Sequence, residues 1–120
     1  MQYVLLIYGE ENGWASRSED DLEALHAGYG KLTGELRAQG KLLAADELQP
    51  VATATTVQVR KDETIVSDGP FAATKEVLGG YYLIEAGSLD EAIEWAAKIP
   101  DAREGKIEIR PIVDHSGTAS

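Results

Sequence analysis

The chain has 120 residues, no cysteine and a formal net charge of −10. This length predicts a single domain with one hydrophobic core, and the lack of cysteine excludes disulfides and thiolate metal sites. The acidic charge disfavours binding to nucleic acid or to an anionic membrane, because both attract basic surfaces. We therefore expect no direct contact with either, whereas a basic regulatory protein is a compatible partner.

The first residues bear on the location of the protein. No lysine or arginine precedes the first apolar run, and this run covers only Tyr3–Tyr8, which is too short for a signal-peptide core or a membrane span. We therefore expect a cytoplasmic protein. Its domain is predicted to cover residues 1–113, followed by a small, polar and flexible tail over residues 114–120.

The first third of the chain predicts a strand, a loop and a long helix. Val4–Tyr8 is the strand and Gly9–Ala15 the loop. Ser18 and Asp21 have the spacing of a capping box that starts a helix, and Gly40 suits its end. Apolar residues recur at three- and four-residue steps between these ends. They are Leu22, Leu25, Tyr29, Leu32 and Leu36.

Three glycines lie inside this predicted helix, at Gly28, Gly30 and Gly34. Each costs roughly 1 kcal/mol relative to alanine in a helix interior. Such a cost indicates either a close approach by a neighbouring element or a tolerated weakness, and both interpretations stay open.

The rest of the chain predicts four strands and a second helix. Lys41–Leu48 and Gly80–Glu85 are strands, and Thr53–Arg60 and Glu63–Ser67 form a hairpin around Lys61–Asp62. Ser88 and Glu91 form a capping box for the helix, which stops at Pro100. The final strand covers Lys106–Ile112. The predicted inner face of the helix consists of Leu89, Ala92, Ile93 and Ala96.

Without the hairpin, the order of elements is strand, helix, strand, strand, helix, strand, which is typical of the α+β ferredoxin-like fold. Its central strands are then Val4–Tyr8 and Gly80–Glu85, which are apolar at consecutive positions. Such strands need cover on both faces of the sheet. The helices cover one face, so we expect a second copy of the chain on the other, in a homodimer that forms a dimeric α+β barrel.

Asp68 is the first candidate for chemistry. It follows a predicted strand, and Gly69–Pro70 holds it in a sharp bend. A carboxylate held in this way could act as a general base, or orient a histidine or a substrate hydroxyl. Aspartate also opens turns by binding backbone donors two residues further on. The residue types alone favour this second interpretation.

The segment Ser67–Phe71 resembles the DGPF-motif branch of the YCII-related family, and so do Tyr3–Gly9, Gly79–Ile84 and Glu108–Ile112. The resemblance extends over nearly all of residues 1–112. It implies a dimeric α+β barrel. It also strengthens a functional role for Asp68, because the motif takes its name from Asp68 and the three residues that follow it.

YCII-type relatives carry a histidine on the first helix that pairs with an aspartate as a catalytic dyad. Counting back from Gly40, the matching position holds Tyr29 in this chain, which departs from the family pattern. His26 lies one helical turn earlier and is the alternative proton partner for Asp68. A partly exposed histidine at the border of the helix is the simpler interpretation of His26.

Seven further residues are candidate ligand-binding residues around Asp68. Lys75 could neutralise a carboxylate or phenolate ligand. A solvated loop, a solvated strand end and ordinary core packing explain the same residues without a ligand. The seven are Tyr8, Glu47, Gly69, Pro70, Phe71, Thr74 and Lys75.

These observations predict a protein that binds a small organic ligand near Asp68. Any reaction would be acid/base chemistry of the isomerase or lyase type, with Tyr29 or His26 as the proton partner. The two histidines lie far apart and no metal or nucleotide motif is present, so we expect neither a metal nor a cofactor. The alternative is a non-catalytic sensing or partner-binding module, since relatives occur linked to sigma-factor-type transcription regulators.

Overall fold

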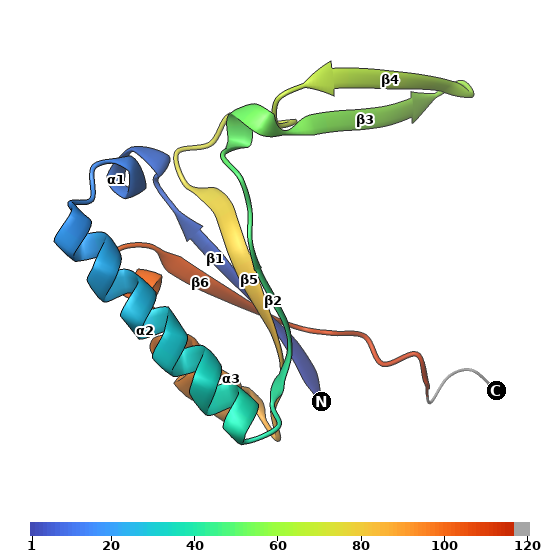
Figure 1. The fold of residues 1–120 in the computed structure, drawn as a ribbon. Helices are drawn as coiled ribbons and strands as arrows, with labels where there is room; N and C mark the ends of the chain where they lie inside the picture. The colour runs from blue at the N-terminus through green and yellow to red at the C-terminus, as the bar shows by residue number, and fades with distance from the viewer. Residues whose placement is uncertain (117–120) are drawn as a thin grey trace.

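The computed structural model describes residues 1–116 as a mixed α+β fold, with helices on one face of an antiparallel sheet (Figure 1). Part of the predicted tail, residues 117–120, lies outside the described residues. The elements are β1 (Gln2–Gly9), α1 (Glu11–Ala15), α2 (Glu19–Ala38), β2 (Leu42–Glu47), η1 (Val51–Thr53), β3 (Thr55–Arg60), β4 (Glu63–Asp68), β5 (Val77–Glu85), α3 (Leu89–Ala97), η2 (Pro100–Arg103) and β6 (Lys106–Pro111).

The main sheet has four antiparallel strands in the order β2-β5-β1-β6. The two predicted central strands, β1 and β5, therefore lie at its centre, and the predicted ferredoxin-like α+β fold is confirmed. The remaining strands, β3 and β4, pair only with each other. They form a separate hairpin that projects away from the body of the molecule (Figure 1).

The hydrophobic core lies between the sheet and the two long helices. Alternate residues of β1 and β5 point into it, because side chains on a strand alternate between faces. Leu36 of α2 and Ile84 of β5 are completely buried there. The other core residues are Tyr3, Leu5, Ile7, Leu32, Tyr82, Ala86, Ala92, Trp95, Ala96 and Ile99.

The opposite face of the sheet carries the intervening residues. Val4, Leu6 and Leu83 lie at its centre and are only half-buried. Within residues 1–116, no helix covers this face (Figure 1). The edge strand β6 adds charged side chains to it, at Lys106, Glu108 and Arg110. We call this surface the bare sheet face.

Both helices begin at the predicted caps. Ser18 accepts a hydrogen bond from the backbone of Asp21 at 3.1 Å, and the Asp21 carboxylate accepts one from the backbone of Ser18, so the first capping box is confirmed. Ser88 likewise accepts from the backbone of Glu91 at 3.1 Å. The Glu91 carboxylate, however, binds the backbone N–H of Gly87 and not that of Ser88.

The predicted inner face of α3 is partly wrong. Leu89 and Ile93 are 51% and 48% exposed, whereas Trp95 is buried. The buried stripe follows the helical repeat from Ala92 to Ile99, and Trp95 supplies the large side chain that fills the core.

The predicted loop at Gly9–Ala15 is also wrong in part, because residues 11–15 form α1. The Trp14 ring of this helix packs directly against two backbone positions that lack a side chain, Gly9 and Gly79. A Cβ at either glycine would lie 2.6 Å from the ring. This tertiary contact holds a helix of five residues, which has little stability by itself.

Both interpretations of the α2 glycines apply, the close approach of a neighbour at one position and a tolerated weakness at the other two. A Cβ at Gly28 would lie 2.9 Å from Cγ of Pro100, so this glycine lets η2 approach the helix closely. Gly30 and Gly34 face open space and are tolerated weaknesses. Gly40 has a φ of 69° just beyond the end of the helix, as its predicted role requires.

Stability is expected to fall in acid through Glu91. Its carboxylate accepts hydrogen bonds from Lys41 at 2.6 Å and from the Gly87 backbone and the Trp95 indole at 3.1 Å. These bonds, the one from Lys41 most of all, lower the pKa of Glu91 from 4.5 to about 2. A lowered folded-state pKa stabilises the fold above the unfolded pKa, and this stabilisation disappears as the pH falls through the folded pKa. Urea unfolding between pH 4.5 and 2 should therefore show a loss of stability that is smaller in Glu91→Gln. An identical decline in both proteins would contradict this role.

Candidate functional site

The structure places Asp68 at the end of β4, on the exposed hairpin. Gly69 turns the chain there with a φ of 90°, as predicted, and donates its N–H to the carbonyl of Ala54 at 2.7 Å. The Asp68 carboxylate makes no hydrogen bond or ion pair to any of residues 1–116. Phe71 follows with 88% of its surface exposed. Within residues 1–116, Asp68 and Phe71 are therefore both exposed.

A buried polar cluster lies elsewhere, at the junction of α2 and η2. Asp101 is only 8% exposed. Its Oδ2 accepts a hydrogen bond from the hydroxyl of Tyr29, and its Oδ1 accepts one from the guanidinium of Arg17. The same guanidinium lies 3.5 Å from the carboxylate of Glu104 at the surface. Both oxygens of Asp101 are thus satisfied by the protein, and its charge is balanced.

Local structure explains why these groups meet. Arg17 directly precedes the cap of α2, while Pro100 starts η2 at the end of α3 and presents the following Asp101. Gly28 lets the Pro100 ring approach α2 one residue before Tyr29. The carbonyl of Asp101 also accepts the N–H of Gly105 at 2.8 Å, which closes the turn into β6.

Tyr29 is held as a hydrogen-bond donor. Its ring stacks on Tyr82 with centroids 6.3 Å apart, and the hydroxyl of Tyr82 lies 2.8 Å from that of Thr33. Burial, and then the hydrogen bond to Asp101, raise the pKa of Tyr29 far above its ordinary value of 10. The phenol therefore stays protonated at neutral pH and cannot readily serve as a base.

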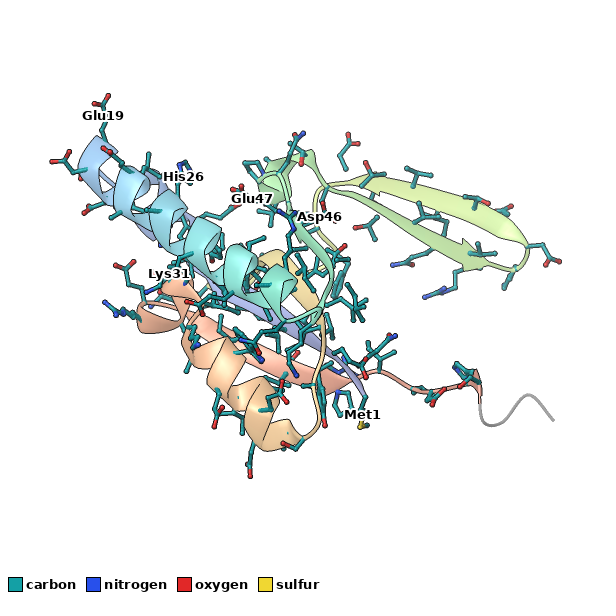
Figure 2. All side chains as sticks on the ribbon, turned by 60° about the horizontal axis from the view of Figure 1, so that its bottom comes forward. Met1, Glu19, His26, Lys31, Asp46 and Glu47 are labelled. Carbon is teal, nitrogen blue, oxygen red and sulfur yellow. The ribbon has the colours of Figure 1, made fainter. Side chains whose placement is uncertain are left out.

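The other predicted site residues lie apart from this cluster. His26 is exposed on α2, and Glu47 is exposed at the end of β2 beside Asp46 (Figure 2). The structure brings neither residue to Asp68 by any hydrogen bond or ion pair within residues 1–116. The side chain of Lys75 is 84% exposed, and its Nζ forms an ion pair with Oε1 of Glu10 at 3.3 Å.

An open hollow of about 330 Å³ lies beside the ends of β1 and β6. It contains Tyr8, one of the predicted ligand-binding residues. Lys106 forms an ion pair with Glu76 at its wall, and the hydroxyl of Thr74, another predicted residue, donates to the Glu76 carbonyl at 2.8 Å. The lining residues are Tyr8, Glu76, Lys106, Ile107 and Glu108.

Sequence reasoning missed several residues of these two sites. Asp101 follows the proline that ends the second helix, and Arg17 precedes the first capping box. An acidic residue beside a helix-stopping proline was the available signal for Asp101, but nothing local connects it with residues 72 and 84 positions away. Lys106 and Glu108 were expected only as members of the final strand, Lys106–Ile112.

Comparison with known proteins identifies the family. The sequence model of the YCII-related domain matches residues 1–116. The chain belongs to the YCII-related family. An uncharacterized protein from Rhizobium meliloti (strain 1021) is 37% identical over 114 residues, which cover 93% of this chain and 92% of that protein. The resemblance to the family is thus confirmed, while assignment to the DGPF branch stays a prediction.

Among residues 1–116, none of the helices has the length and apolar character that a bilayer crossing requires.

Proposed function

We propose that this YCII-related protein binds a small polar organic molecule in the hollow beside Tyr8. The observation that carries the proposal is that Tyr8 lines this hollow together with three charged residues, while its hydroxyl has no hydrogen-bond partner among residues 1–116. The volume of about 330 Å³ lies at the lower end of the range for ligand pockets. Such a hollow suits a molecule with one ring and a few polar groups.

The charges of the hollow favour an amine over an acid. Lys106 is neutralised by its ion pair with Glu76. The carboxylate of Glu108 has no ion pair or hydrogen bond within residues 1–116, so one negative charge remains for a ligand. A cationic or hydrogen-bond-donating group of the ligand would bind Glu108, and the ring of the ligand would lie against Tyr8. This ligand class differs from the carboxylate or phenolate that Lys75 suggested.

The acid/base chemistry predicted for Asp68 and Tyr29 has weaker support. The proton of Tyr29 is directed at Asp101, and its raised pKa opposes deprotonation. Asp68 lies on the projecting hairpin. Binding without turnover therefore fits the geometry better, and a link to a regulatory protein stays a prediction.

We also propose that the working form is a homodimer in which two bare sheet faces pack together. Val4, Leu6 and Leu83 would be buried at the centre of this interface. The hollow borders the same face through Tyr8 and Lys106, so a second copy would close it further and shield the ligand from water.

A thermal-shift screen tests the proposed ligand class. Small aryl amines and the matched aryl acids are compared on the wild type, on Glu108→Gln and on Glu23→Gln, a control on the exposed surface of α2. We expect amines alone to stabilise the wild type and the control, by about 2.7 kcal/mol at a hundred times Kd. Glu108→Gln should lose most of this stabilisation. Equal stabilisation by acids, or an unchanged response of Glu108→Gln, would overturn the proposal.

A further inference from the structure

The projecting β3–β4 hairpin, which we call the arm, has two different faces. Residues directly opposite each other in an antiparallel pair share a face. One face thus carries the pairs Val57–Val66, Val59–Thr64 and Thr55–Asp68, and we call it the valine face. The other carries Gln58–Ile65, Arg60–Glu63 and Thr56–Ser67, and is mainly polar.

The valine face is uncovered in the single chain. Val57, Val59 and Val66 are 59%, 58% and 61% exposed, and the arm extends away from the sheet and helices (Figure 1). A two-stranded hairpin by itself is at best marginally stable in water. An arm with a regular apolar face therefore needs a surface to pack against.

The dimensions of the chain point the same way. It exposes 8523 Å², whereas a monomeric protein of its mass exposes about 6,300 Å². Its radius of gyration is 16.8 Å, against about 14 Å for a compact domain of this length. The excess of about 2,200 Å² is larger than the roughly 800 Å² that each partner buries in a standard interface.

We propose that the valine face of the arm packs against a second copy of this chain, so that each arm embraces the other subunit. This inference rests on the proposed dimer and adds a second contact to it. A two-fold axis presents the same surfaces twice, so one dimer can cover two arms and two bare sheet faces. A foreign partner seated on the arm would leave the bare sheet face exposed.

The charge distribution is consistent with this occupant. Two chains of charge −10 repel each other at long range, so a contact between copies is least opposed where few acidic side chains lie. Asp68 is the only acidic side chain on the valine face. The arm would place Asp68 and the exposed Phe71 at the subunit boundary, where the single chain gives them no partner.

Labelling of single cysteines tests the arm contact, because the chain contains no cysteine. Val57→Cys and Gln58→Cys place adjacent thiols on opposite faces of the arm, and both positions are exposed in the single chain. In the dimer, we expect a maleimide to modify the Val57→Cys protein at least tenfold more slowly than the Gln58→Cys protein. Dilution into the monomer range should remove the difference.

Light scattering on the same samples separates the possible failures. A monomer at all concentrations would overturn both the dimer and the arm contact. A dimer in which the Val57→Cys and Gln58→Cys thiols react at equal rates would overturn the arm contact alone.

A second pair of variants tests the same contact by charge. Val57→Lys should weaken dimerisation at least tenfold, whereas Gln58→Lys should leave it unchanged. Circular dichroism checks that both variants stay folded, and equal affinity of the two would also overturn the arm contact.

Discussion

Replacing Asp101 with alanine is expected to destabilise the protein by about 3–5 kcal/mol, because the change removes the buried partner of a largely buried positive charge. The side chains of Arg17 and Asp101 are only 12% and 10% exposed. Without the carboxylate, the Arg17 guanidinium loses its buried partner and the Tyr29 hydroxyl loses its acceptor. Urea unfolding followed by circular dichroism measures the difference in unfolding free energy from the wild type.

Glu104 provides the matched control for this experiment. Its carboxylate also lies near the Arg17 guanidinium, at 3.5 Å, but its side chain is 73% exposed. Surface ion pairs contribute about 0–1 kcal/mol, so Glu104→Gln should have at most that effect. A cost below about 1 kcal/mol for Asp101→Ala, similar to that of the control, would show that the cluster is not structurally important.

Gly105→Ala is the second substitution with a large expected effect, of about 3 kcal/mol. A Cβ at this position would overlap the carbonyl oxygen of Tyr8, and it would lie 3.2 Å from the carbonyl carbon and 3.3 Å from the carbonyl oxygen of Asp101. These are backbone atoms, so only a shift of β6 against β1 can relieve the overlap. Denaturant unfolding measures the loss.

Gly30→Ala is the control for a glycine without close neighbours. Nothing lies within 4 Å of the added Cβ, and alanine favours the helix over glycine, so we expect a gain of about 0.5–1 kcal/mol. A similar loss of stability in both alanine variants would show that the backbone approach at Gly105 is not the cause.

Interactions between near neighbours made much of the fold predictable. The Ser18–Asp21 capping box, the end of α2 at Gly40 and the hairpin around Lys61–Asp62 all depend on contacts within a few residues. The consecutive apolar residues of the two predicted central strands also identified the middle of the sheet, where β1 and β5 lie.

The candidate site was less predictable because its parts come from distant segments. Tyr8 and Tyr29 were identified as candidates, and the structure places them in the hollow and in the polar cluster. Lys106, which stands opposite Tyr8 in the sheet, and Asp101, which accepts the hydrogen bond of Tyr29, belong to the last third of the chain. No spacing rule connects residues that meet only after the sheet and helices have assembled.

The amino-acid pattern by itself determined the order of the main strands and the two long helices, the N-caps of those helices and which two strands lie at the centre of the sheet, since these follow from local geometry and side-chain periodicity. Tertiary structure alone decided that Trp14 holds a short helix against two glycines, that Tyr29 donates to Asp101, and that Asp68 lies on a projecting arm. These features depend on which surfaces meet across the folded chain, and a contact between distant residues leaves no periodic signal in the sequence.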